Sequence, residues 1–179
     1  MKRSSAARGF TLIELMVVVV IVGVLAALAV VGYRKLVNSS HTSEATHMVQ
    51  AIRVAQESYR AEAGAYANIS TSMNGLCPVH AMGTKAPWDP SCNGGSATWS
   101  VLAVHADGPV LFKYATMAGK GGTSLPALPT GSTAGSLGGT PANDWFLVSA
   151  ISDIDGNGVN CVVVGTSWSN QIYVDRESE

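Results

Sequence analysis

The sequence contains few charged residues and no strongly basic region outside its first positions. Charged residues account for 13% of the 179 positions, the formal net charge is −1, and Lys2, Arg3 and Arg8 all lie near the N-terminus. A mildly acidic chain has no electrostatic preference for nucleic acid, so we predict no direct nucleic-acid binding. Because 47% of the residues are hydrophobic, the composition predicts a folded protein and excludes global disorder.

Signatures of catalysis are also missing from the sequence. It has no GxSxG, HExxH or phosphate-loop motif, and no nucleophile or acid stands at a catalytic spacing from His80 or His105. We therefore predict that the chain is not an enzyme and that it holds no cofactor, apart from the calcium hypothesis below.

The cysteines are few and lack the spacing of a metal site. Cys77, Cys92 and Cys161 are an odd number with no CxxC pair, which weakens any zinc interpretation. In an exported chain, a disulfide between Cys77 and Cys92 would close a loop rich in Gly, Pro and Ser. Three reduced thiols are the alternative, and the sequence does not decide between the two.

The longest stretch without charge lies close to the N-terminus. The 19 residues from Leu15 to Tyr33 contain no charged side chain. As a helix they would extend about 28 Å at ~1.5 Å per residue, close to the ~30 Å of a bilayer's hydrocarbon core. The basic residues before this stretch favour a cytoplasmic N-terminus, although Arg34 and Lys35 follow it and make the bias modest.

One acid, Glu14, lies just inside the apolar edge of this stretch. A lone carboxylate in hydrocarbon costs about 2.5 to 3.5 kcal/mol, so it normally has a partner, and the segment holds no other charge. A conventional secretory signal cleaved after Ala29 is a competing interpretation. Glu14 and the lack of a helix break after the apolar run both count against it.

The residues Gly9, Phe10, Thr11, Leu12, Ile13, Glu14 and Leu15 follow a short basic leader and precede the apolar run. This pattern resembles the class III signal of type IV pilins and pseudopilins. The resemblance implies that a prepilin peptidase and methyltransferase cleaves between Gly9 and Phe10 and methylates the new amino group. It also implies that the helix stays in the membrane until the inner-membrane assembly machinery moves the subunit into a filament.

The resemblance also offers a partner for Glu14. In a helical homopolymer, the Phe10 amine of one subunit can meet the Glu14 carboxylate of its neighbour, and each charge makes the other tolerable. Many pilins have a proline about twenty residues into the mature chain. Here Val30, Val31 and Gly32 stand in that region, so we expect local softening of the helix without a proline kink.

Beyond the apolar run, the pattern predicts an α+β fold. The apolar residues of 34–64 recur at helical spacing and predict an amphipathic helix that packs on a C-terminal antiparallel sheet and stops at Gly64. The predicted organisation is a leader at 1–9, a membrane or filament-core helix at 10–33, the amphipathic helix at 34–64, an irregular loop at 65–97 and the sheet at 98–179. Within the irregular loop, we expect Trp88 to be a packing anchor. The expected strands are 98–106, 110–118, 144–153, 160–168 and 170–177, with a flexible surface loop at 119–143 that is nearly free of charge and of large apolar groups.

A short acidic motif precedes the fourth expected strand. Asp153, Asp155 and Asn157 place oxygen atoms at alternate positions before Gly158, which matches the start of a calcium loop. The twelfth position is Val164, so the closing Glu is missing and an EF-hand is excluded. A looser calcium site and a plain hairpin turn remain, and we favour the turn.

These features predict a structural subunit of a type IV pilus that acts in adhesion, surface motility or DNA uptake. The chain would be a single-pass prepilin in the bacterial inner membrane and then part of an extracellular filament. A minor pilin or a type II secretion pseudopilin is the nearest alternative. A secreted binding domain and a permanently tethered head are alternatives of other classes. The mature N-terminus separates the three classes, because it would be Phe10, Val30 or Met1 respectively.

Overall fold

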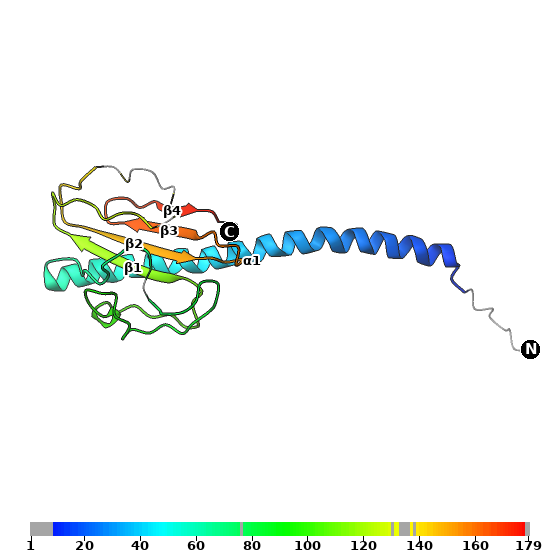
Figure 1. The fold of residues 1–179 in the computed structure, drawn as a ribbon, viewed down its shortest axis with the longest axis horizontal. Helices are drawn as coiled ribbons and strands as arrows, with labels where there is room; N and C mark the ends of the chain where they lie inside the picture. Colours follow the sequence, from blue (N-terminus) through cyan, green and yellow to red (C-terminus); the bar gives the residue numbers. More distant parts are fainter. Residues whose placement is uncertain (1–8, 76, 130, 133–136, 138, 178–179) are drawn as a thin grey trace, which may run out of the picture. The chain divides into compact units, whose positions relative to one another are not determined.

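The computed structural model describes residues 9–75, 77–129, 131–132, 137 and 139–177 of the chain. Its elements are the helix α1 (Leu12–Ala63) and the strands β1 (Lys113–Gly119), β2 (Trp145–Ser152), β3 (Cys161–Thr166) and β4 (Ile172–Asp175), which Figure 1 labels. A short 3-10 helix, η1 (Trp99–Val101), precedes β1. The chain divides into two compact units, of which the first ends at Val37 and the second begins at Asn38. The α+β fold predicted from the sequence is confirmed. Residues 1–8 of the predicted leader lie outside the described residues.

The C-terminal end of α1 has a specific local cause. Gly64 follows the last helical residue with φ of 76°, and its N–H donates to the carbonyl of Arg60 at 2.8 Å. A left-handed residue with this hydrogen bond is a common way to end a helix, and glycine adopts the conformation without steric cost. The predicted helix stop at Gly64 is therefore confirmed.

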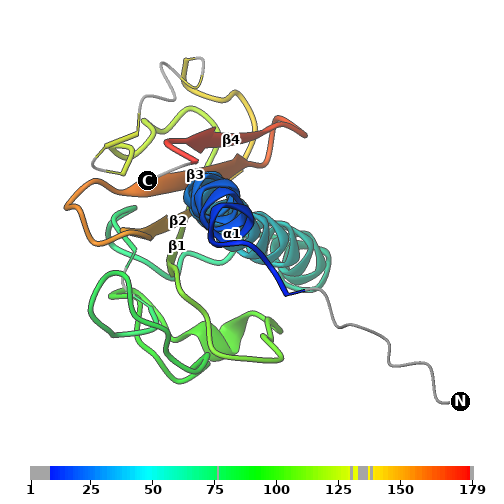
Figure 2. The same cartoon turned by 90° about the vertical axis from the view of Figure 1, so that its right-hand side faces the viewer.

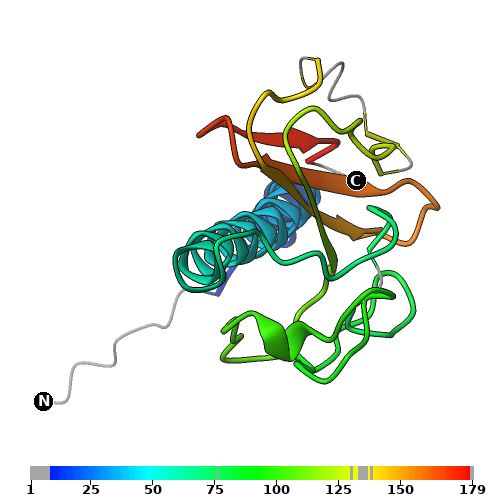
Figure 3. The same cartoon turned by 90° about the vertical axis from the view of Figure 1, so that its left-hand side faces the viewer.

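The second unit's part of α1 buries one face against the sheet. Its buried apolar residues are Ala45, Met48, Val49 and Ile52, which recur at spacings of three and four. The helix comes close to β3 at Gly165, where an added Cβ would lie only 2.8 Å from Val49 Cγ1. Figures 2 and 3 show this part of the helix alongside the sheet. The predicted packing of an amphipathic helix on a sheet is thus present.

The sheet has the order β1-β2-β3-β4, and all its neighbours are antiparallel. Every residue of β2 and β3 is buried, so both faces of these central strands are covered. Alternate residues divide between two clusters. Phe146, Val148, Ala150 and Val163 share one with the helix, whereas Leu147, Ile151, Val162 and Val164 share the other with leucines from the 119–143 loop.

Those loop leucines correct one expectation from the sequence. Leu125, Leu128 and Leu137 are partly buried and pack against the second cluster. The segment 119–143 was expected to be a flexible surface loop nearly free of large apolar groups. In the structure these three leucines instead cover the sheet face that lies opposite the helix.

The expected strand at 98–106 is wrong, and the sheet begins at Lys113. Within this segment, the amide of Leu102 donates to the carbonyl of Trp99 at 3.1 Å, and the amide of Trp99 donates to Cys92 at 3.1 Å. These bonds form a 3-10 turn tied to the preceding loop. The buried residues Trp99 and Leu102 are three apart, which suits such a turn better than the two-residue period of a strand.

The irregular loop at 65–97 is held by aromatic side chains and by a disulfide. The indole of Trp88 packs edge to face on Trp99 and Tyr114, at ring distances of 5.2 and 5.8 Å, and its Nε1 donates to Val104 at 3.0 Å. Trp88 is thus a packing anchor for the loop. The Sγ atoms of Cys77 and Cys92 are bonded to each other, so the loop closes on itself beside the aromatic cluster.

Candidate functional site

The N-terminal end of α1 carries a capping box formed by Thr11 and Glu14. Glu14 Oε2 accepts hydrogen bonds from the Thr11 amide at 2.9 Å and from the Thr11 hydroxyl at 2.6 Å. The Glu14 amide in turn donates to Thr11 Oγ1 at 3.3 Å. This reciprocal pattern satisfies backbone donors that the first helical turn leaves without partners. The carboxylate also lies at the positive end of the helix dipole.

The capping box corrects our account of Glu14 from the sequence. The sequence predicts no partner for its carboxylate within the segment, because the segment holds no other charge. The structure shows an uncharged partner, Thr11, and the spacing T-x-x-E from Thr11 to Glu14 is a sequence signal for this cap. Within the described residues, Oε2 takes both hydrogen bonds and Oε1 accepts none, so the carboxylate keeps an acceptor and its charge for another partner.

The first unit exposes a continuous apolar surface. The large apolar side chains from Phe10 to Leu36 are all exposed, from 53% at Val17 to 85% at Phe10. Among the described helices, α1 is long and apolar enough to cross a membrane by length and composition. An apolar surface of this extent calls for a lipid environment or for other protein chains, because water does not solvate it favourably.

The bond between Gly9 and Phe10 precedes the helix. Gly9, Phe10 and Thr11 have no helical structure, and Gly9 and Phe10 are exposed. The bond between them is therefore accessible, while the cap at Thr11 marks where the helix begins.

The acidic motif after β2 forms a turn held by its own carboxylates. Asp153 Oδ1 accepts from the amides of Gly156 at 2.8 Å and Asn157 at 3.1 Å, and Asp153 Oδ2 accepts from Gly158 at 2.9 Å. Asp155 Oδ1 also accepts from the Asn157 amide, at 3.2 Å. These oxygens thus point at backbone N–H groups, as in Asx turns. Among the described residues, no group of three or more His, Cys, Asp or Glu side chains is arranged to hold a metal ion.

We expect the Asp153 turn to be insensitive to calcium. Adding calcium or a chelator should leave the thermal unfolding midpoint of the chain unchanged, since the carboxylates already accept backbone hydrogen bonds. Asp153→Ala should lower the free energy of unfolding by about 1 kcal/mol through loss of those bonds. The exposed Asp107 offers a matched control, because Asp107→Ala removes a solvent-exposed acid whose Oδ1 lies 3.8 Å from His105 Nε2. A rise of the midpoint with calcium that Asp153→Ala abolishes would contradict the turn interpretation.

The remaining cysteine, Cys161, is buried in β3 and is not in a disulfide. Burial raises the pKa of its thiol to about 11, and its Sγ lies 3.9 Å from the hydroxyl of Thr42. The thiol is therefore protonated at neutral pH and is a poor nucleophile. We assign it a packing role.

The N-terminal segment of the chain is similar to a known family of N-terminal motifs. Residues 4–30 match the family model "Prokaryotic N-terminal methylation motif". The type IV major pilin protein PilA of Myxococcus xanthus (strain DK1622) is 42% identical over 71 residues, which are 40% of this chain and 32% of that protein. The fimbrial protein EcpC of Eikenella corrodens is 38% identical over 74 residues, 38% of this chain and 48% of that protein.

A fimbrial protein of Pseudomonas aeruginosa is 45% identical over 53 residues, which cover 30% of this chain and 34% of that protein. The chain therefore spans less than half the length of these relatives. No solved structure matches the chain significantly. The resemblance to type IV prepilins that the sequence predicted is confirmed by the motif at residues 4–30 and by these pilin and fimbrial relatives.

Proposed function

From the methylation motif at its N-terminus and its pilin relatives, we propose that this chain is a structural subunit of a type IV pilus. One observation carries the proposal. The helix from Leu15 to Tyr33 is exposed and carries no charge, and it follows directly on the cap formed by Thr11 and Glu14. A helix that is apolar all round has to be buried in a membrane or among other chains. A helical homopolymer offers that burial to every copy.

Processing would occur at the N-terminal end of this helix. A prepilin peptidase would cleave between Gly9 and Phe10 and methylate the Phe10 amine. The proposal is supported by the exposed, non-helical backbone of Gly9 and Phe10. Cleavage leaves the Thr11–Glu14 cap in place, so the mature helix keeps its first turn.

Assembly would use the charge that the cap leaves available. In the filament, the Phe10 ammonium of one subunit would pair with the Glu14 carboxylate of its neighbour. Two opposite charges in an apolar core are tolerable as a pair, whereas either one alone is costly. The pairing would also fix the axial register between subunits. The second unit, with its sheet and loops, would then be presented outside the filament core.

The remaining parts of the proposal follow from this arrangement. The chain would pass through the inner membrane as a single-pass prepilin, meet the assembly machinery there and leave the cell as an extracellular filament in adhesion, surface motility or DNA uptake. We assign the subunit no enzymatic activity, so the energy for assembly would come from another protein.

The mature N-terminus tests this proposal directly. Protein sheared from the cell surface should have an intact mass and terminal sequence that begin with methylated Phe10, and it should be recovered as filaments in electron micrographs. A chain that begins at Val30 would instead indicate conventional secretion and would discard Glu14 before any assembly. A chain that begins at Met1 and stays with the membrane would indicate a tethered head. Either result would overturn the proposal.

A further inference from the structure

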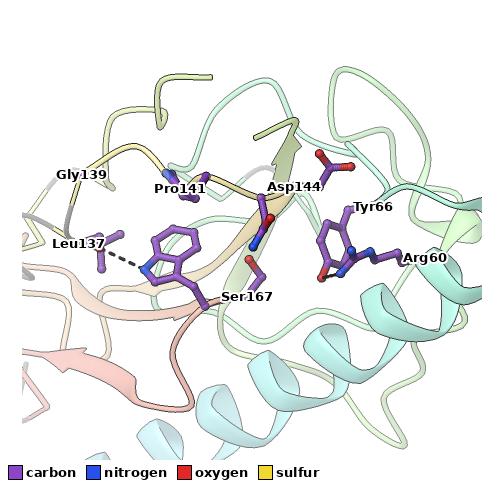
Figure 4. A pocket seen from close by; sticks show the side chains of 10 residues that line it. Arg60, Tyr66, Leu137, Gly139, Pro141, Asp144 and Ser167 are labelled. Carbon is purple, nitrogen blue, oxygen red and sulfur yellow. Dashed lines mark hydrogen bonds between the residues drawn. The ribbon is translucent and has the colours of Figure 1, made fainter. Parts of the chain in front are cut away.

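A cavity of about 430 Å³ opens at the end of the sheet where α1 ends. Arg60 and Tyr66 form one side, Pro141 and Leu137 lie on the other, and Ser167 lies between them, as Figure 4 shows. Trp168, Asn143 and Asp144 also line the cavity. The volume falls within the ~300–1,000 Å³ of small-molecule sites. All residues that line the cavity belong to the second unit.

Two aromatic side chains of this cavity are held in fixed orientations. Trp168 is 39% exposed, and its Nε1 donates to the carbonyl of Leu137 at 3.2 Å. The hydroxyl of Tyr66 accepts from Arg60 at 2.8 Å and donates to Glu57 at 3.0 Å. The Arg60 guanidinium also lies 4.8 Å from the centre of the Tyr66 ring. An exposed indole is an apolar surface that a ligand can cover, and a fixed one loses little entropy on binding.

Polar groups with unused hydrogen-bonding capacity line the same cavity. Asp144 Oδ1 accepts from the Gly121 amide at 3.0 Å, and within the described residues its Oδ2 accepts no hydrogen bond. Ser167 Oγ accepts from the Phe146 amide at 3.1 Å, which leaves its hydroxyl hydrogen available to a ligand. The described part of the chain gives the Asn143 amide no hydrogen-bond partner. The site thus offers a carboxylate, a hydroxyl and an amide.

The electrostatics of the cavity favour a ligand without net charge. Arg60 and Asp144 contribute one charge of each sign. Burial raises the pKa of Tyr66, with the hydrogen bond to Glu57 acting in the same direction, so its hydroxyl stays neutral. The guanidinium is already engaged by the Tyr66 hydroxyl and ring. A phosphate or carboxylate ligand would compete for Arg60 and be repelled by Asp144.

We propose that this cavity binds a neutral hexopyranose, such as a residue of a surface or matrix polysaccharide. The apolar C–H face of the sugar ring would cover the exposed side of the Trp168 indole. Its hydroxyl groups would donate to Asp144 Oδ2 and exchange hydrogen bonds with Asn143 and Ser167. A ligand that is apolar on one face and rich in hydroxyls at its edge matches this combination of surfaces. The site goes beyond the proposed filament function and does not depend on assembly.

Saturation-transfer NMR on the full chain tests the proposal. The chain should be held in a nonionic detergent with a polyoxyethylene headgroup, because a maltoside or glucoside headgroup would itself compete for the site. The probes are the methyl glycosides of glucose, galactose and mannose and N-acetylglucosamine, with glucuronic acid and inorganic phosphate as anionic comparisons. At least one neutral hexose should bind with millimolar affinity, which is usual for so small a ligand.

Substitutions at Trp168 and Asn143, with a control at His105, test whether a bound hexose occupies this cavity. Trp168→Ala should weaken hexose binding about tenfold or more, and Trp168→Phe should recover part of the loss because it keeps an aromatic face. Asn143→Ala should weaken binding severalfold without touching the aromatic wall. His105→Ala, an exposed residue that lines a different cavity, is the matched control and should bind as the wild type does. Unfolding curves of each variant check that the second unit remains folded.

The possible results separate cleanly. Loss of hexose binding in the Trp168 and Asn143 variants, with the His105 control unaffected, supports the site. The proposal is overturned if no neutral hexose binds the folded wild type, or if binding survives both substitutions. Binding confined to glucuronic acid or phosphate would assign the cavity to an anion at Arg60, and it would also overturn the proposal. None of these results bears on the proposed filament function, which is tested separately by a mature N-terminus at Phe10.

Discussion

Replacing Glu14 by alanine is expected to abolish surface filaments, or to reduce them to a small fraction of the wild type, while membrane insertion and leader cleavage continue. In the proposed filament, the substitution leaves the Phe10 ammonium of each neighbouring subunit without a partner in an apolar core. Breaking a buried ion pair in this way costs about 3–5 kcal/mol. Since ~1.4 kcal/mol is a tenfold change, the concentration needed for assembly should rise by a hundredfold or more.

The capping box requires a second substitution before that result can be assigned to the charge. Glu14 also accepts two hydrogen bonds from Thr11, so Glu14→Ala removes a helix cap together with a charge. Glu14→Gln keeps a side chain that can complete the cap but removes the charge. Thr11→Val has the opposite effect, because it removes the hydroxyl and leaves the carboxylate in place.

The three variants predict a clear order. Glu14→Gln should assemble nearly as poorly as Glu14→Ala, whereas Thr11→Val should assemble well, since a lost cap costs only about 1 kcal/mol. Filaments are counted in electron micrographs and by immunoblot of the sheared fraction, and cleavage is followed by the mass of membrane-bound subunits. Abundant filaments from Glu14→Gln would show that the acid acts through the cap and not through a charge pair. Failure of cleavage in any variant would make its filament count uninformative about pairing, so the membrane-bound mass is the internal control.

Local patterns in the sequence predicted the elements whose cause is local. Gly64 ends the helix because the backbone there is left-handed, a conformation that favours glycine. A glycine after a helical pattern can be read directly from the sequence. The strands at β2 and β3 are apolar runs bounded by turn residues, and they form as predicted. The cap at Thr11 and Glu14 is equally local, because its T-x-x-E spacing can be read from the sequence.

Contacts between distant segments explain the expectations that failed. The segment at 98–106 has the composition of a strand, yet its Trp99 packs on the Trp88 indole and begins the 3-10 helix η1. The leucines of the 119–143 loop are too widely spaced to form a periodic pattern. These leucines are buried because they cover one face of the sheet. The strands that form this face are distant in sequence, so residues next to the leucines give no sign of their burial.

Gln56 is the clearest case of a residue that sequence patterns could not identify. It lies four residues after Ile52 on the buried face of the helix, and it is completely buried although its side chain is polar. Its Nε2 donates to the carbonyl of Ala67 at 2.8 Å and to Thr116 Oγ1 at 3.0 Å, and its Oε1 accepts from the Ala67 amide at 2.9 Å. Thr116 Oγ1 donates onward to the carbonyl of Leu147 at 3.0 Å. One amide thereby joins the helix, the loop that follows it and strands β1 and β2.

Substituting Gln56 by alanine is expected to lower the free energy of unfolding of the second unit by about 3–5 kcal/mol. The change leaves the buried N–H and C=O of Ala67 without partners, at about 1–3 kcal/mol for each group, and it opens a small cavity. Urea unfolding of the full chain in nonionic detergent, followed by tryptophan fluorescence, measures the effect. All 4 tryptophans lie after residue 87, so the signal reports the second unit.

A volume-matched variant separates the hydrogen bonds from the packing. Gln56→Met fills nearly the same space without the amide, so it should recover only the cavity part of the loss and remain about 2 kcal/mol or more below the wild type. Gln50→Ala is the matched surface control on the same helix, because Gln50 is exposed, and its cost should stay within about 0.5 kcal/mol. If Gln56→Met were as stable as the wild type, the buried amide would contribute no net stability. Its hydrogen bonds would then only offset the cost of burying it, and the junction of helix, loop and sheet would depend on apolar packing alone.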